Sequence, residues 1–321
     1  MLRPGRKRSN LIQTVPLLAV AVDMAAPPAQ AANERLPKPK DIALTTKDGV
    51  QLKGTFYPST EGSREKIVPV VLLHDYKETR AVYDDLARQL QAAPLNDSTK
   101  APRAVLTIDF RGHGESKTAT TIQGNTVELD AANFRNPDFE AMVRFDMEAV
   151  RGFLVDKNNS GQLNLNQLCL VGSGMGANVA VLWTATDWSM PPLPRLKQGQ
   201  DVKALVLVSP RWKYRGLPLL QAIKHPAVQR EISIFLAYGE KDRKVAKDAE
   251  NIYQNFERFH PEPPRDKIAE LKDLYRVGVP TTLQGTELLT KRQFDLAPLV
   301  DIFIERRLGS KDFTWINRTV Q

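Results

Sequence analysis

The sequence predicts an α/β fold with a mostly parallel central sheet and helices on both faces. Six short runs consist mainly of apolar residues, and segments with apolar residues at helical spacing lie between them. Such runs are typical of strands that are buried on both faces, as in a parallel sheet covered by helices. The six runs are Val68–Leu73, Ala104–Ile108, Leu168–Val171, Val202–Val208, Ile232–Ala237 and Leu274–Val279.

A β-hairpin is expected before the first of these runs. Two β-like segments, Ile42–Thr46 and Val50–Tyr57, flank Asp48-Gly49, and an Asp-Gly step in this setting is a strong hairpin signal. Between the later strands, helices are indicated by the apolar positions Phe139, Met142, Val143, Val150, Phe153 and Leu154, by Ala177, Val181 and Leu182, and by a closing segment Pro298–Leu308.

The first 31 of the 321 residues do not fit this core. They contain a basic start (Arg3, Arg6, Lys7 and Arg8), an apolar run (Leu11–Val22) and the small-x-small pattern Ala29-Gln30-Ala31. This order is typical of an export signal with a cleavage site. The apolar run is short and contains polar residues and a proline, so a membrane-spanning helix is not expected.

We therefore expect an export signal at 1–31, a linker at 32–40, one domain at 41–308 and a C-terminal tail at 309–321. The mature protein is expected to be periplasmic or extracellular, without an integral membrane segment. A disordered cytosolic tail or an uncleaved anchor is the alternative for the leader.

The charge pattern points away from nucleic acid. Without the leader the net charge falls from +8 to +5, and acidic and basic residues are interleaved, as in Glu240–Lys244. That pattern is typical of a solvated surface. The only cysteine, Cys169, lies in an apolar run, and no metal-type spacing or glycine-rich phosphate loop is present. No metal or cofactor is therefore expected.

Two segments bear on the carboxyl edge of the sheet. Pro210–Glu231 is only about twenty residues long, which leaves room for one helix around Leu217–Ile223 but not for a lid domain. The sequence thus predicts a minimal cap. The insertion Lys117–Pro137 is long enough to fold over the same edge.

Three motifs give the chain a family resemblance. They are Leu72-Leu73-His74-Asp75-Tyr76, Ile108-Asp109-Phe110-Arg111-Gly112-His113-Gly114-Glu115-Ser116 and Leu170-Val171-Gly172-Ser173-Gly174-Met175-Gly176-Ala177. In this order and spacing they resemble the His-Gly segment, the Arg-Gly-His-Gly turn and the nucleophile elbow of the α/β-hydrolase family, over residues 41 to 308. The resemblance implies the α/β-hydrolase sheet order and the activity of a serine esterase.

Carried over motif by motif, the resemblance indicates a degenerate catalytic triad. Gly174 stands where the elbow has its nucleophilic serine, and Ser173 is the preceding residue, whose side chain turns away from the pocket. Gln284 stands, within a residue or two, where the family has its histidine. Asp242 matches the acid, either as a vestigial triad member or as a turn or helix-cap aspartate.

The absence of the histidine does not depend on the exact alignment. The four histidines are His74, His113, His225 and His260, and none follows the last predicted strand. A serine needs an adjacent base to accept its proton, and a glutamine cannot do so. His74 and His113 are expected to be structural.

The resemblance places the oxyanion-hole region at His74, Asp75, Tyr76 and Met175. The resemblance implies that the backbone N–H groups of Met175 and Tyr76 are the donors. Asp75 replaces the usual glycine, and a carboxylate there opposes the developing negative charge unless it points away.

The sequence thus predicts an exported protein that has lost serine-type hydrolysis and acts as a binding or scaffolding protein. Its partner is expected to be a small molecule or an envelope protein, of unknown identity. The alternative is a hydrolase of an ester or amide bond that uses a non-standard constellation, with water activated by Asp242 or Asp75.

Overall fold

The computed structural model describes residues 36–318 except 61, 192, 194–195 and 295. The predicted export signal lies outside the described residues. Among the helices that are described, none is both long and apolar enough to cross a bilayer.

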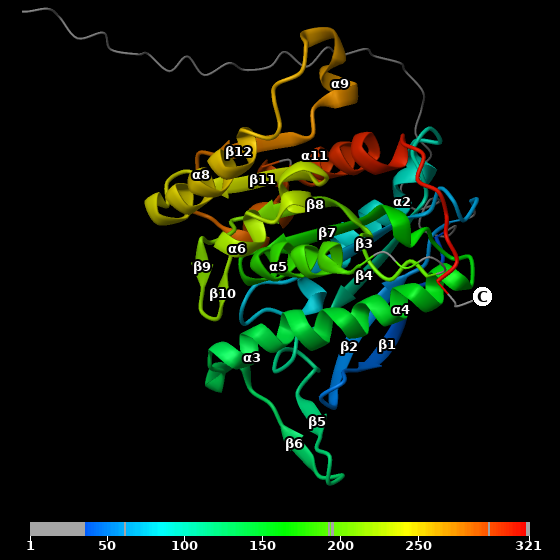
Figure 1. The fold of residues 1–321 in the computed structure, drawn as a ribbon, viewed down its shortest axis with the longest axis vertical. Coiled ribbons are helices and arrows are strands. Elements are labelled where there is room, and N and C mark those ends of the chain that lie inside the picture. The colour runs from blue at the N-terminus through cyan, green and yellow to red at the C-terminus, as the bar shows by residue number, and fades with distance from the viewer. Residues whose placement is uncertain (1–35, 61, 192, 194–195, 295, 319–321) are drawn as a thin grey trace, which may run out of the picture.

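The predicted α/β fold is confirmed. Ten of the described strands form one sheet in the order β12-β11-β8-β7-β3-β4-β2-β5-β6, with β1 paired to β2. The pairs from β12 to β4 are parallel, and those that involve β1, β2, β5 and β6 are antiparallel. This places the carboxyl ends of β3, β7, β8, β11 and β12 along one edge, as Figure 1 shows.

All but two of the strands in this sheet begin and end within two residues of the predicted segments. They are β1 (Lys40–Thr45), β2 (Val50–Tyr57), β3 (Val68–Leu73), β4 (Arg103–Ile108), β5 (Thr118–Thr120), β6 (Thr126–Glu128), β7 (Leu168–Ser173), β8 (Val202–Val208), β11 (Ser233–Gly239) and β12 (Leu274–Val279). Of these, β5 and β6 were not expected. The strands β9 (Lys213–Tyr214) and β10 (Leu217–Pro218) form a separate short hairpin.

The helices lie in both layers around the sheet (Figure 1). The α-helices are α2 (Asp84–Asn96), α3 (Asn136–Ala141), α4 (Met147–Asn159), α5 (Met175–Ser189), α6 (Leu220–Ile223), α7 (Pro226–Arg230), α8 (Arg243–Glu257), α9 (Ile268–Leu271), α10 (Gly285–Thr290) and α11 (Leu296–Ile304). Shorter turns are η1 (Arg80–Tyr83), η2 (Ala131–Asn133), η3 (Met142–Asp146), η4 (Leu165–Gln167), η5 (Arg265–Lys267), η6 (Arg292–Phe294) and η7 (Glu305–Gly309).

Each face of the sheet has its own core. Successive residues of a strand point to opposite faces, so in β3 the side chains of Val71 and Leu73 pack on one side and those of Val70 and Leu72 on the other. Helices α4, α5 and α8 cover the first side, and α2, α10 and α11 cover the second. All six residues of β3 are buried, which explains its unbroken apolar sequence.

The cap is minimal, but it differs in detail from the prediction. Instead of one helix around Leu217–Ile223, the segment after β8 forms the β9–β10 hairpin and two short helices, α6 and α7. The insertion Lys117–Pro137 does two things. Its first half extends the sheet as β5–β6, and its second half returns to the edge, where the Tyr76 hydroxyl donates to the Ala131 carbonyl (3.2 Å).

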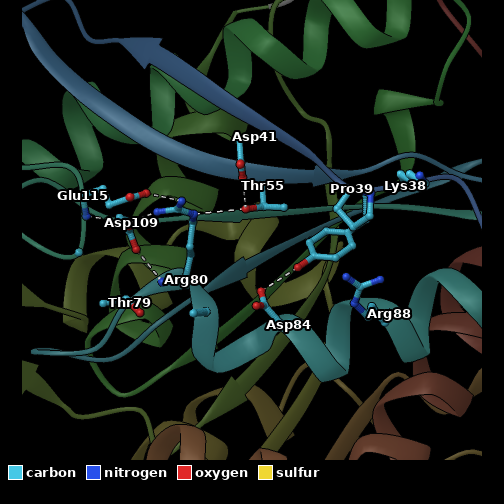
Figure 2. Close-up of a pocket in the computed structure, with 13 residues that line it drawn as sticks. Lys38, Pro39, Asp41, Thr55, Thr79, Arg80, Asp84, Arg88, Asp109 and Glu115 are labelled. Carbon is cyan, nitrogen blue, oxygen red and sulfur yellow. Dashed lines mark hydrogen bonds and ion pairs between the residues drawn. The ribbon is translucent and has the colours of Figure 1, made fainter.

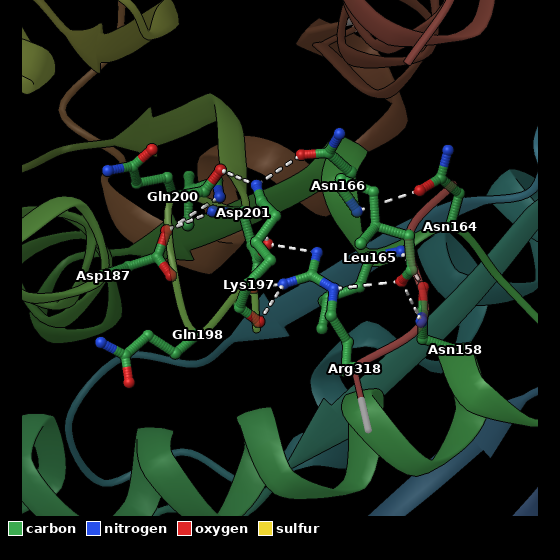
Figure 3. Close-up of polar contacts among 12 residues, drawn as sticks. Asn158, Asn164, Leu165, Asn166, Asp187, Lys197, Gln198, Gln200, Asp201 and Arg318 are labelled. Carbon is green, nitrogen blue, oxygen red and sulfur yellow. Dashed lines mark hydrogen bonds and ion pairs between the residues drawn. The ribbon is translucent and has the colours of Figure 1, made fainter. Parts of the chain in front are cut away.

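The chain after η7 is fastened to the domain up to the last described residue (Figure 3). Three asparagine side chains donate to its carbonyls: Asn158 to Ile316 (2.9 Å), Asn164 to Phe313 (2.7 Å) and Asn166 to Thr314 (3.0 Å). The guanidinium of Arg318 lies 2.6 Å from an Asp201 carboxylate oxygen, and both side chains are almost fully buried.

Candidate functional site

The turn between β7 and α5 has the strand-turn-helix form of a nucleophile elbow. Gly174 lies at its apex with φ 50° and ψ −110°, a conformation that costs free energy for residues other than glycine. The flanking glycines are sterically required. A Cβ on Gly172 would lie within 3.0 Å of the Gly176 backbone, and a Cβ on Gly176 within 3.0 Å of the Leu73 carbonyl.

The side chain of Asp75 points into this turn. Its Oδ1 accepts hydrogen bonds from the backbone N–H of Met175 (2.7 Å) and from its own neighbour Tyr76 (2.7 Å). These are the two donors expected for an oxyanion hole. Both are therefore already hydrogen-bonded to one carboxylate oxygen of the protein itself.

The other carboxylate oxygen fills the space beside Gly174. A Cβ on Gly174 would lie within 3.0 Å of Asp75 Oδ2, and a Cβ on Gly285 would lie 3.0 Å from the same atom. Both glycines have positive φ, 50° and 58°. The Asp75 carboxylate thus lies in the place where a nucleophile's side chain would begin.

The electrostatic state of Asp75 reflects this position. Burial raises the pKa of its carboxyl above the usual value, although the two amide donors and the nearby Arg211 act in the opposite direction. A second carboxylate lies close by. Glu78 Oε2 accepts from the Asp75 backbone N–H (2.9 Å) and from the Thr286 hydroxyl (2.5 Å), and burial raises the pKa of Glu78 as well.

Gln284 lies at the same edge, immediately before α10. Its side-chain amide pairs with both backbone groups of Gly239: Oε1 accepts from the N–H (3.0 Å) and Nε2 donates to the carbonyl (2.8 Å). Oε1 also accepts from the Ser209 hydroxyl (2.7 Å), which in turn accepts from the Gly285 N–H (2.9 Å). The amide thus joins the ends of β8 and β11 to the loop after β12.

Asp242 caps a helix. Its Oδ1 accepts from the backbone N–H groups of Lys244 (3.0 Å) and Val245 (3.1 Å) at the start of α8. Among the hydrogen bonds of the described residues, none joins Asp242 to Gln284. The geometry therefore provides a direct structural role for this aspartate.

The two histidines near the site are held by the backbone. His74 Nε2 accepts from the Phe110 N–H (3.1 Å), so its Nδ1 carries the proton and donates to the Asp75 carbonyl (2.6 Å). Burial lowers the pKa of His74 to about 4. His113 Nδ1 lies 2.9 Å from the Arg111 carbonyl, and burial lowers its pKa too. Both rings are neutral at pH 7.

Ser173 is buried and points away from the elbow. Its hydroxyl accepts from Tyr83 Oη (2.7 Å), on the side of the sheet covered by α2. The serine next to Gly174 is thus part of the core between β7 and α2.

Sequence reasoning missed two residues of this site. Glu78 orders the loop that carries Asp75, and its only sequence signal is an acidic residue three positions after Asp75. Ser209 bridges Gln284 and Gly285 from the end of β8, with φ 53°. A serine before proline at the end of an apolar strand marks such a turn, but it does not reveal the partner.

Three solved structures show the same fold. An esterase of Pyrococcus furiosus has a TM-score of 0.56 and 18% identity, over 90% of this chain and all of that one. A carboxylesterase cloned from a metagenomic library, EstE1, has a TM-score of 0.56 and 12% identity, over 87% of this chain and 92% of that one. A peroxisomal α/β-hydrolase of Saccharomyces cerevisiae, Lpx1, has a TM-score of 0.58 and 12% identity, over 87% of this chain and 92% of that one. At these identities the likeness concerns the fold.

Among the curated proteins, no sequence matches the chain. The family described as serine aminopeptidase, S33, matches residues 65–230, which run from just before β3 to the end of α7 and make up more than half of the chain. Together with the sheet order and the elbow, this match confirms the α/β-hydrolase resemblance. The chain belongs to the serine aminopeptidase S33 family of α/β-hydrolases.

Proposed function

We propose that the protein is an exported member of its family that does not catalyse serine-type hydrolysis and instead acts as a binding or scaffolding protein. One observation carries the proposal. The Asp75 carboxylate accepts hydrogen bonds from both backbone N–H groups that would stabilise an oxyanion.

An oxyanion hole works because its donors face the position where negative charge develops in the transition state. Here those donors already hold a carboxylate oxygen. A substrate carbonyl would have to displace Asp75 before it could bind, and the displaced carboxylate would still lie near the reacting centre. Loss of one such donor typically costs about 10²–10³ in rate, and here both are occupied.

The other groups support the same interpretation. Gly174 has no side chain with which to attack, and the Gln284 amide is hydrogen-bonded to Gly239 and Ser209. A glutamine cannot accept the proton of a serine. Asp242 caps α8, a role that it fulfils without any imidazole.

Export is proposed from the leader alone, whose basic, apolar and small-x-small parts are those of a secretory signal. N-terminal sequencing of the protein from its native host is expected to find a start near Ala32. An intact Met1 in the soluble cytosolic fraction would contradict this part of the proposal.

The activity test uses purified protein with short-chain p-nitrophenyl esters, an aminoacyl p-nitroanilide and a fluorophosphonate probe. We expect no turnover above the buffer rate and no covalent labelling, while an active serine esterase is labelled in parallel. Turnover that disappears in Asp75→Asn would instead support hydrolysis by water activated at Asp75. Labelling that disappears in Ser173→Ala would show that the neighbouring serine is the nucleophile.

A further inference from the structure

A pocket lies away from Gly174. It has a volume of about 690 Å³, which is in the range of small-molecule sites. It is formed by the chain leading into β1, by β2, by η1 and the start of α2, and by the turn after β4 (Figure 2). Asp75, Gly174 and Gln284 do not line it, so the role of this pocket is independent of the proposed function.

One end of the pocket is cationic and lined by apolar surface. Lys38, Pro39 and Arg88 lie there (Figure 2), and the Tyr57 ring lines the same pocket. The Arg88 guanidinium stands 6.0 Å from the Tyr57 ring centroid. Among the ion pairs between described residues, none includes Lys38 or Arg88. The Asp84 carboxylate, which also lines the pocket, accepts a hydrogen bond from the Tyr57 hydroxyl (2.8 Å).

The other end is anionic. Arg80 lies between two carboxylates there, forming ion pairs with the buried Asp109 and the exposed Glu115. It also donates to the Thr55 hydroxyl (3.2 Å), which in turn donates to Asp41 Oδ1 (3.2 Å). Two carboxylates thus contact the Arg80 guanidinium, and a third, on Asp41, is connected to it through Thr55. Asp109 is buried and both its oxygens already accept hydrogen bonds, so Asp41 and Glu115 are the carboxylates that can accept from a ligand.

The two ends of the pocket lie beside residues that are two positions apart on the same strand. The anionic end is centred on Thr55 and the cationic end on Tyr57, both on β2. Residues two apart on a strand point to the same face and lie about 7 Å from each other. The pocket therefore has cationic side chains beside Tyr57 and carboxylates beside Thr55, at two positions on the same face of one strand.

We propose that this pocket binds a small zwitterion with its ammonium and carboxylate groups at opposite ends, such as an extended dipeptide or a long ω-amino acid. The carboxylate binds Lys38 and Arg88. The ammonium binds Asp41 and Glu115. Any aliphatic part of the ligand lies against Pro39 and Tyr57.

The charge arrangement favours a ligand that carries both charges. A plain anion would meet three carboxylates close to Arg80, and a plain cation would meet Lys38 and Arg88 without a counter-charge. Only a ligand with both charges satisfies both ends. Charge-assisted hydrogen bonds are the stronger kind, so each end contributes to affinity and to orientation.

Isothermal titration calorimetry with glycylleucine and with 6-aminohexanoate tests the proposal. We expect at least one of them to bind with a Kd of about 1 mM or tighter. N-acetylglycylleucine lacks the ammonium and glycylleucinamide lacks the carboxylate, so each is expected to bind at least about tenfold more weakly than the parent. Failure of both zwitterions to bind, or equal binding of the blocked compounds, would overturn the proposal.

Two variants place the ligand in the pocket. Arg88→Gln is expected to weaken the binding of glycylleucine about tenfold but to leave the affinity for glycylleucinamide unchanged. Asp41→Asn is expected to weaken the binding of glycylleucine and to leave the affinity for N-acetylglycylleucine unchanged. The matched control is Arg243→Gln, on an exposed helical arginine of α8 that does not line the pocket. Binding that is insensitive to Arg88 and Asp41 would place the ligand elsewhere.

Discussion

The substitution Gly174→Ser is expected to destabilise the protein mainly through Asp75. A serine there must adopt a φ near 50°, which costs about 1–3 kcal/mol. Its Cβ would also lie within 3.0 Å of Asp75 Oδ2, so the carboxylate must leave the two N–H groups that it accepts from. Because hydrogen bonds to charged groups are worth about 1.5–3 kcal/mol each and water replaces part of that, we expect a total loss of about 2–5 kcal/mol.

A double-mutant cycle separates the two causes. Asp75→Ala breaks the same two hydrogen bonds from Met175 and Tyr76, although it also removes the burial cost of the carboxylate. In the double variant Gly174→Ser, Asp75→Ala the steric conflict is gone, and the loss of these hydrogen bonds, which both single variants suffer, is counted only once. The double variant should therefore be at least about 1 kcal/mol more stable than the sum of the single effects.

Urea denaturation followed by circular dichroism measures all four proteins. If the effects of Gly174→Ser and Asp75→Ala add within about 0.5 kcal/mol, the two residues are energetically independent and Asp75 is not the cause of the loss. A Gly174→Ser variant as stable as the wild type would also show that Asp75 does not fill the elbow.

Two further predictions concern buried charges. Burial raises the pKa of Asp187 to about 6, so ionisation of this carboxyl lowers the stability of the folded protein as the pH rises from about 4 through 6. The non-ionising variant Asp187→Asn should therefore gain stability relative to wild type over that range. A difference in urea midpoint that stays constant between about pH 4.5 and 7.5 would contradict this. Arg318→Ala leaves the buried Asp201 without its 2.6 Å partner and should cost about 3–5 kcal/mol, measured by thermal and urea unfolding, whereas Arg243→Ala on the surface should cost less than about 0.5 kcal/mol. Equal effects of the two arginine variants would mean that the tail is not held by this ion pair.

The strands of the sheet were predictable because burial on both faces imposes an unbroken apolar sequence. Val68–Leu73 and Val202–Val208 were located to the residue for this reason. The short strands β5 and β6 were not, since all their residues except Ala119 are exposed and their sequence carries little apolar signal. The β9–β10 hairpin was missed for a similar reason, as each of its strands has only two residues.

The sequence predicted which residues lie at the candidate site, but not the contacts that they make. It indicated that Asp75 is a carboxylate close to the expected oxyanion hole, but it did not show which way the side chain points. That depends on the space left by Gly174 and Gly285 and on two backbone N–H groups from segments one hundred residues apart. Likewise, nothing in the local sequence shows that the Gln284 amide pairs with the backbone of Gly239.

The contacts of the C-terminal tail were also not predictable from the sequence. Residues 309–321 were predicted as a segment beyond the domain, yet the described part of it, up to Arg318, is anchored by side chains from α4 and η4 and by Asp201. Such contacts join residues more than one hundred positions apart, and no local pattern encodes them.

The proposed loss of serine-type hydrolysis depends on the glycine at position 174, on the glutamine at position 284 and on the contacts of Asp75 with two backbone N–H groups. Intact-mass detection of fluorophosphonate labelling tests it most directly, because one covalent event per molecule is enough. The series is wild type, Gly174→Ser with Gln284→His, and the same pair with Asp75→Gly, each shown to be folded by circular dichroism.

We expect no label on the wild type and little on the double variant, in which Asp75 still competes for the two N–H groups. Labelling should appear in the triple variant, because nucleophile, base and free donors act as a unit. A label on the wild-type protein would contradict the proposed loss of hydrolysis. So would a folded triple variant that stays unlabelled while an active esterase in the same solution reacts.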